Sequence, residues 1–120
     1  MSAQKPDAIS EDDWERHEAR MDEVNDNHMG IQMAYLHLSA LSLTTRRSHA
    51  IRHGRIFTAQ QAKEFWSDHG NIMGCRCRVV PVMVDDDGKP VVPSIVERAR
   101  KTYEKMLGRG YGWAMDGDDQ

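Results

Sequence analysis

Large side chains recur at spacings of three and four between residues 14 and 38, and this pattern constrains the fold more than any other. In an α-helix such residues form one stripe that packs against another helix. Ser10 and the three acidic residues after it suit a helix start, because a hydroxyl caps free amides and carboxylates face the positive end of the dipole. We expect a helical, heptad-like segment at 10–43, as one helix or as two divided at the polar run 25–30. The stripe consists of Trp14, His17, Met21, Val24, His28, Ile31, Tyr35 and Leu38.

The partner of this stripe can be the rest of the chain, a second copy or another protein. Stripes of this kind more often belong to an ordinary core than to a recognition surface. We therefore expect packing within the chain, with a homodimer through residues 14–38 as the alternative.

Two further helices and one short β element follow. Thr58 suits the cap of a helix that ends at Gly70, and Pro93 and Ser94 suit the start of another that ends at Gly108. The apolar run at 75–84 reads as a strand, which its proline places at a sheet edge or a bulge, and a turn at 85–90 can return as a second strand. We predict an α+β fold, mostly helical, with one small β-hairpin or short strand pair in the middle.

The expected organisation has four parts. Residues 1–9 read as a flexible acidic N-terminus, 10–43 as the helical segment, 44–108 as a domain that contains the histidines and cysteines, and 109–120 as an acidic tail. No run approaches the roughly 18 apolar residues that a membrane helix needs, so we expect no membrane span. Cys75 and Cys77 are too close in sequence to suit a structural disulfide, which favours a reducing cytoplasm with the thiols free or bound to metal.

Charge is distributed unevenly along the chain, whose net charge is −3. Residues 1–30 contain nine acidic and three basic residues, whereas residues 44–78 contain seven basic and two acidic ones. The two blocks can attract each other, or the basic one can contact an anionic partner such as DNA. The candidate nucleic-acid contacts are Arg46, Arg47, Arg52, Arg55, Arg76 and Arg78.

Histidines and cysteines gather in the same basic region. If 44–53 is helical, His49 and His53 lie one turn apart on one face; if 75–79 is a strand, both thiols point to one side of it. Imidazole and thiolate together suit tetrahedral zinc. The alternative is a packed thiol pair beside hydrogen-bonded histidines. The candidate ligands are His49, His53, His69, Cys75 and Cys77.

Catalysis is a further alternative for these residues. Two histidines can act as acid and base around a phosphodiester, and an arginine can stabilise the phosphate. If the chain is an enzyme, the catalytic residues are His49, His53 and Arg46. No P-loop or nucleophile elbow supports this, and the aspartates at 85–87 belong to a turn sequence.

The stretch "RRSHAIRHGRIF", followed by "HGNIMGCRC" and "VVPV", resembles the C-terminal segment of phage minor head, or head morphogenesis, proteins of the Mu-like F family. The resemblance covers roughly residues 40–107. It implies a non-enzymatic, phage- or prophage-derived domain that binds portal or capsid proteins, in the bacterial host cytoplasm or the virion, with zinc as its cofactor. The matching residues are Arg46, His49, His53, Gly54, Phe57, His69, Asn71, Cys75 and Cys77.

Two other functions stay open beside head assembly. A short chain with acidic flanks can be a phage effector that inhibits a host defence nuclease complex, because arrays of carboxylates can occupy a surface meant for nucleic acid. A histidine-dependent nuclease or toxin is the other.

Overall fold

The α+β prediction is confirmed by the computed structural model, which describes residues 4–25, 31–42 and 44–109. The regular elements, in chain order, are α1 (Glu11–Asn25), β1 (Met33–Leu38), α2 (Arg47–Ala50), β2 (Ile56–Phe57), α3 (Ala59–Ser67), the 3-10 helix η1 (His69–Asn71), β3 (Arg78–Met83) and α4 (Ser94–Leu107). None of the helices in this described part is long and apolar enough to cross a membrane.

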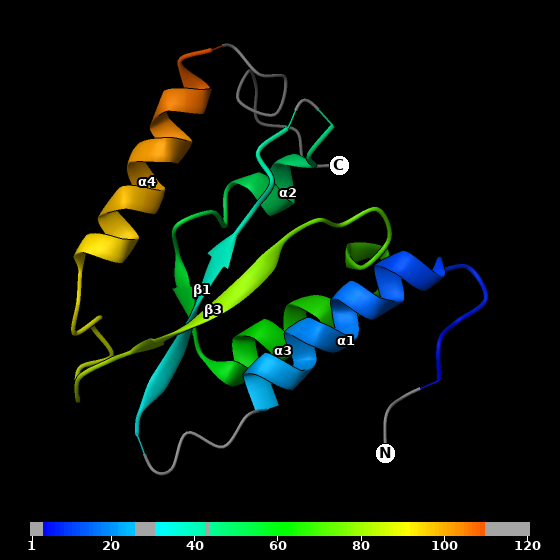
Figure 1. Ribbon diagram of the computed structural model, residues 1–120, viewed down its shortest axis with the longest axis horizontal. Coiled ribbons are helices and arrows are strands. Elements are labelled where there is room, and N and C mark those ends of the chain that lie inside the picture. Colours follow the sequence, from blue (N-terminus) through cyan, green and yellow to red (C-terminus); the bar gives the residue numbers. More distant parts are fainter. Residues whose placement is uncertain (1–3, 26–30, 43, 110–120) are drawn as a thin grey trace.

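The strands form one antiparallel sheet in the order β2-β1-β3 (Figure 1). β1 is therefore the central strand, and Tyr35 lies opposite Phe57 of β2 and Pro81 of β3. Pro81 cannot donate a ladder hydrogen bond, and it lies in an edge strand, as its sequence context predicts. Only an isolated bridge, between Val84 and Pro90, follows the turn at 85–90, so no second strand forms there.

Helices cover the two faces of the sheet unequally. α1 and α3 pack on one face, where Trp14, Tyr35 and Trp66 belong to the main buried cluster. α4 reaches the opposite face, on which Leu36 and Val82 are buried and Val96 packs against them. Figure 1 shows α1 and α3 together on one side of β1 and β3 and α4 on the other. The first half of the expected stripe, from Trp14 to Val24, thus packs inside the chain.

The prediction of a helix in the second half of the segment 10–43 is wrong, because residues 33–38 form strand β1. A central strand that is covered on both faces needs apolar residues throughout, and a short apolar run fits helical spacing equally well. His28 lies outside the described residues. Since β1 lies between β2 and β3, segments 10–43 and 44–108 share one sheet, and a dimer would have no continuous helical stripe to use.

Two smaller expectations also need correction. Ile9, in the expected flexible N-terminus, is only 2% exposed and belongs to the main core cluster. The helix supposed at 44–53 is reduced to the single turn α2, after which Gly54 adopts a positive φ of 80°. Of the expected acidic tail, residues 110–120 lie outside the described part.

Candidate metal centre

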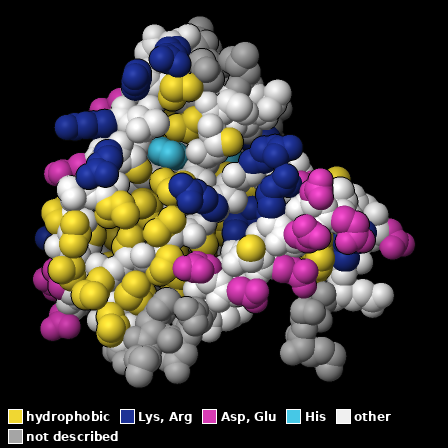
Figure 2. Space-filling model, in the orientation of Figure 1, with side chains coloured by type: hydrophobic (Ala, Val, Ile, Leu, Met, Phe, Trp, Pro, Cys, Tyr) yellow, Lys and Arg dark blue, Asp and Glu magenta, His cyan; other side chains and the backbone are white. Residues whose placement is uncertain are grey.

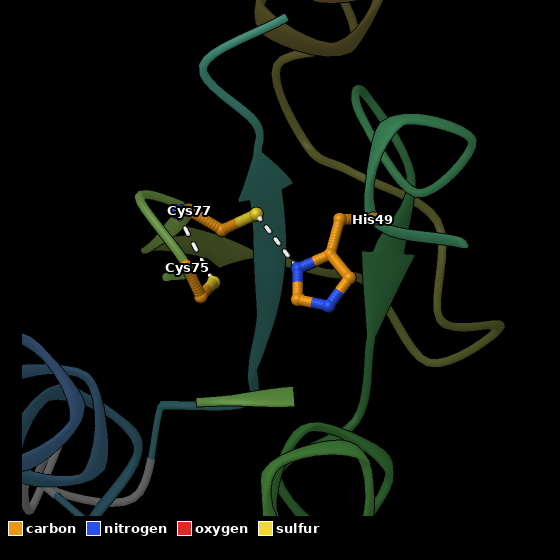
Figure 3. A group of neighbouring side chains, drawn as sticks. All are labelled: His49, Cys75 and Cys77. Carbon is orange, nitrogen blue, oxygen red and sulfur yellow. Dashed lines mark hydrogen bonds between the residues drawn. The ribbon is translucent and has the colours of Figure 1, made fainter. Parts of the chain in front are cut away.

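One imidazole and two thiols converge in the interior of the protein. A ring nitrogen of His49 and the sulfur atoms of Cys75 and Cys77 all lie within 4.8 Å of one another. His49 belongs to α2, and both cysteines lie in the segment that leads into β3 (Figure 3). Nδ1 of His49 is 3.5 Å from Sγ of Cys77, and all three residues are buried. This donor set can hold a metal ion.

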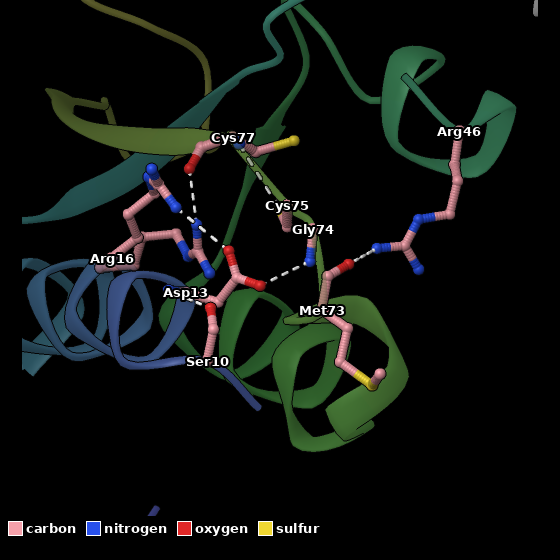
Figure 4. Close-up of polar contacts among 9 residues, drawn as sticks. Ser10, Asp13, Arg16, Arg46, Met73, Gly74, Cys75 and Cys77 are labelled. Carbon is pink, nitrogen blue, oxygen red and sulfur yellow. Dashed lines mark hydrogen bonds and ion pairs between the residues drawn. The ribbon is translucent and has the colours of Figure 1, made fainter. Parts of the chain in front are cut away.

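Local hydrogen bonds position the segment that carries the thiols. The guanidinium of Arg46 donates to the carbonyls of Gly70 and Met73, which ties the start of α2 to the loop before Cys75. The backbone N–H of Gly74 donates to Oδ2 of Asp13 at 2.8 Å, which ties the same loop to α1 (Figure 4). The loop is therefore fixed from both sides of the site.

The two thiols share a proton unequally. The pKa of Cys75 lies well below its usual value, because the Cys77 side chain hydrogen-bonds to its thiolate and His49 and Arg20 stabilise the charge further. The pKa of Cys77 is raised, because its thiol holds the shared proton and is buried. One thiolate is thus favoured in the absence of a metal, and thiolate is the form that binds one.

A buried cation lies beside the thiols. The guanidinium of Arg20 is buried, donates to the carbonyl of Cys77 at 2.7 Å and lies 4.6 Å from the ring centroid of Trp66. Its Nε and Nη2 have no hydrogen-bond partner among the described residues. No carboxylate pairs with it in this part of the chain, so the nearby thiolates are the negative charges that compensate for it.

A second cation lies close to the same pair. The guanidinium of Arg52 is 3.9 Å from the ring centroid of Phe57 and 3.8 Å from that of Phe65. Burial lowers its pKa to about 10, and the charge of Cys77 opposes that shift. Arg20 and Arg52 thus place two positive charges near the sulfur atoms, and these charges favour the single thiolate that the cysteine pair holds.

A small cavity adjoins the three ligands. Its volume is about 60 Å³, and the three ligands line it together with four hydroxyl-bearing residues and, in the described part of the chain, no aspartate or glutamate. This space is sufficient for a water molecule, which could complete a tetrahedral set of ligands. The hydroxyls belong to Ser39, Ser42, Thr44 and Thr45.

Two of the five predicted ligands do not join this group. Nδ1 of His53 accepts a hydrogen bond from the backbone N–H of Ser39 at 3.0 Å, and burial lowers the pKa of this histidine. His69 lies in η1, exposed, with its ring edge toward Trp14. The prediction of a five-residue set is therefore corrected to three residues.

The catalytic set of His49, His53 and Arg46 is not assembled. His49 faces Cys77, His53 accepts from Ser39, and Arg46 is engaged with backbone carbonyls. No carboxylate orients either imidazole among the described residues. The geometry gives no support to an acid–base pair of histidines.

The predicted nucleic-acid contacts divide into two groups. Arg52 is half-buried between two phenyl rings and is corrected from a surface contact to a residue with partners inside the protein. Arg46 and Arg47 are half-buried, and both have partners within the protein. Arg55, Arg76 and Arg78 are exposed, so they can meet an external anion.

Two residues near the site were missed in the sequence. Arg20 could have been found, because it lies three residues after His17 and four before Val24, on the buried side of the predicted stripe. His37 is fully buried in β1 and stacks on Trp66 with ring centroids 5.3 Å apart. It was missed because residues 33–38 were expected to be helical.

Comparison of the chain with protein-family models, with curated proteins and with solved structures gives no match. The geometry of the site and the sequence motifs are therefore the features that indicate a function.

Proposed function

We propose that the chain is a small, non-enzymatic interaction domain of the phage minor-head type, whose fold is held together by a zinc ion on His49, Cys75 and Cys77. The observation that carries the proposal is the convergence of one imidazole and two thiols in a buried, positively charged environment. The sequence motif that resembles minor head proteins contains these same three residues.

Zinc fits the donor set better than magnesium or calcium does. Nitrogen and thiolate sulfur ligands suit zinc, whereas magnesium and calcium prefer oxygen. Two thiolates would neutralise a divalent ion, and the adjoining cavity has room for water in the fourth position. The ion would supply a cross-link between α2 and the start of β3. No aspartate or glutamate among the described residues lines the cavity, so no carboxylate of this part of the chain could act there as a general base.

Metal analysis of protein purified without an affinity tag tests the site. We expect one zinc per chain, and in Cys75→Ser or His49→Ala we expect less than a tenth of that content. His69→Ala is the matched control, since His69 is exposed and outside the group. Zinc loss in His69→Ala equal to that in His49→Ala would refute the assignment.

The second half of the proposal concerns partners. Minor head proteins act among portal and capsid proteins, and the exposed Arg55, Arg76 and Arg78 can add salt-sensitive contacts to DNA. Binding to purified portal and major capsid proteins, and to DNA at low salt, tests this half. We expect retention by at least one virion protein and recovery of the chain from purified virions. Failure to bind portal, capsid and DNA alike would exclude the assembly role and leave the metal site unaffected.

One observation favours a second function, inhibition of a host defence nuclease. α1 presents a group of acidic side chains on its outer surface, and Figure 2 shows acidic side chains gathered on this part of the molecule in magenta. Glu11, Asp12 and Glu15 of α1 are exposed. Such an array can compete with DNA or RNA for a basic channel. Inhibition of a nuclease complex by the chain, relieved by Glu11→Gln/Asp12→Asn/Glu15→Gln, is the expected result; unchanged inhibition by this variant would exclude the mechanism.

A further inference from the structure

A groove separates α4 from the outer face of the sheet. Its volume is about 470 Å³, within the range of pockets that accept ligands or a few side chains of a partner. Leu36 and Leu38 of β1 and Ile95 and Ala99 of α4 line its apolar part. The groove does not share the ligands of the metal centre.

Three arginines line the same groove. They are Arg76 and Arg78, at the start of β3, and Arg98 on α4. All three are exposed, and no ion pair involves them among the described residues. Among the described residues no aspartate or glutamate lines the groove, so no carboxylate of this part of the chain compensates its positive charge.

Exposed apolar side chains lie in the segment that leads into α4. Val91 is 52% exposed, Val92 is 60% exposed, and Ile95, which lines the groove, is 37% exposed. Figure 2 shows this face of the molecule, with apolar surface in yellow beside the dark blue of Lys and Arg. Exposed apolar side chains that lie together beside charged ones are typical of a protein interaction site.

We propose that this groove is a docking site for an acidic peptide segment of a partner protein, one that inserts apolar side chains between α4 and β1. Carboxylates of that segment would meet Arg76, Arg78 and Arg98, which supply charge-assisted hydrogen bonds. The apolar floor would take the side chains that lie between the acids. This docking site adjoins the zinc site, because Arg76 lines both the groove and the cavity beside the metal ligands. None of the three metal ligands lines the groove, and docking does not require a bound metal.

Charge and composition favour a peptide over nucleic acid as the occupant. Base recognition on a single strand uses aromatic platforms, and no Phe, Tyr or Trp among the described residues lines the groove. Duplex DNA is held through phosphates on an outer basic surface and gains nothing from an apolar floor. A segment with both acids and apolar residues uses both halves of the groove.

Selection from a random peptide library on the full, metal-loaded chain tests the docking site and requires no identified partner. We expect enriched peptides that combine Asp or Glu with Leu, Ile, Phe or Trp, and we expect no such enrichment on Arg78→Gln/Arg98→Gln. Enriched peptides that are neutral or basic, or the same peptides on the variant, would overturn the proposal, as would the absence of any enrichment.

Fluorescence anisotropy of a selected peptide gives the quantitative test. The double arginine variant should weaken binding at least tenfold and Ile95→Ser at least fivefold, while circular dichroism shows each variant folded. Lys101→Gln/Lys105→Gln is the matched control, because it removes the same charge from exposed positions of α4 that do not line the groove. If the two double variants lose peptide affinity equally, the loss comes from net charge alone, and the proposal is overturned.

Two competing occupants are tested with the same variants. Displacement of the peptide by a single-stranded oligonucleotide whose own binding requires Arg78 and Arg98 would assign the groove to nucleic acid. A concentration-dependent dimer that Arg78→Gln/Arg98→Gln abolishes would assign it to a second copy. Either result would overturn the peptide proposal.

Discussion

Arg20 is the residue that most clearly distinguishes this centre from an ordinary buried thiol pair. A buried guanidinium with unpaired nitrogens and no carboxylate partner among the described residues is costly unless negative charge lies close by. The pair of Cys75 and Cys77 meets that need, because the thiolate of Cys75 carries a negative charge that Arg20 in turn stabilises. Arg20 therefore acts on the metal through the sulfur atoms.

Replacement of Arg20 should weaken metal binding. In Arg20→Met the pKa of Cys75 rises, so protons compete better for the thiolates and zinc leaves at a higher pH than in the wild type. We expect zinc affinity at neutral pH to fall about 10- to 100-fold, the range for outer residues of metal sites. A chromophoric chelator titrated against the protein at several pH values measures this.

Arg16→Met is the control for Arg20→Met. Arg16 lies one turn earlier on α1 and pairs with Asp13 at the surface. Its replacement should leave the zinc affinity within about twofold, as for other surface substitutions. Equal effects of the two variants would show that Arg20 has no specific relation to the thiolates.

His37 should make stability sensitive to acid. Its pKa is lowered from 6.5 to about 2, chiefly by burial and then by the charge of Arg52. Below pH 6.5 the unfolded chain takes up a proton that the folded chain cannot, so this contribution is complete above that pH and is lost as the pH falls toward 2. The slope approaches about 1.4 kcal/mol per pH unit.

The variant His37→Phe should reduce that slope. Phenylalanine can keep the contact with Trp66 and does not titrate. Urea unfolding at pH 7, 6 and 5, both proteins with zinc in excess, measures the difference. If the two proteins lose stability in parallel, His37 is not the group responsible.

At the scale of elements, Gly54 determines how closely α4 packs against the turn that follows α2. Its φ is 80°, and a Cβ there would lie 2.7 Å from Cδ and 3.1 Å from the backbone nitrogen of Arg100. That side chain is held in place, because its Nη1 donates to the carbonyl of His53 at 2.9 Å. The close approach at Gly54 therefore joins α4 to the turn after α2.

The substitution Gly54→Ala should lower the free energy of unfolding by about 2–4 kcal/mol, from backbone strain and the clash together. Gly88→Ala is the control, since Gly88 has a similar φ of 78° with nothing within 4 Å of the added Cβ. Gly88→Ala should lower the free energy of unfolding by only about 1–2 kcal/mol, because it adds backbone strain without a clash. Urea denaturation compares them, and equal losses would mean that the contact with Arg100 is unimportant.

Capping signals in the sequence predicted the starts of α1, α3 and α4 well. α1 follows Ser10, α3 has the capping box of Thr58 and Gln61, and α4 ends before Gly108. Pro81 correctly marked an edge strand. Local signals of this kind lie within a few residues of the element that they define, which is why they are readable in one sequence.

The central strand and the exact ligand set were not readable in the same way. β1 is apolar because both of its faces are covered, which depends on partners distant in sequence. His49 was correctly grouped with both cysteines, but the exclusion of His53 depends on where α2 ends. α2 ends at Ala50, one turn earlier than expected. His53 therefore faces Ser39 and not the thiols.

At the scale of the whole molecule, the buried residues form three separate clusters among the described residues. The molecule is flat, with extents of 42 × 39 × 19 Å, so no single large core can hold it together. Small domains of this kind gain stability from a metal cross-link. The ion would join α2, which belongs to one cluster, to the cysteines of another.

Removal of zinc should therefore destabilise the whole fold. If free zinc stands a thousandfold above its Kd, binding contributes about 4 kcal/mol, which a chelator would abolish. Thermal unfolding with and without EDTA measures this, with Cys75→Ser as the control that should not respond. An equal response of the variant would place the relevant metal elsewhere.

X-ray absorption at the zinc edge, on protein purified without a tag, tests the central claim most directly. A zinc ion held by His49, Cys75, Cys77 and one water would show two sulfur neighbours at about 2.3 Å and two nitrogen or oxygen neighbours at about 2.0–2.1 Å. A protein without zinc, or a spectrum with only nitrogen and oxygen neighbours, would contradict the claim.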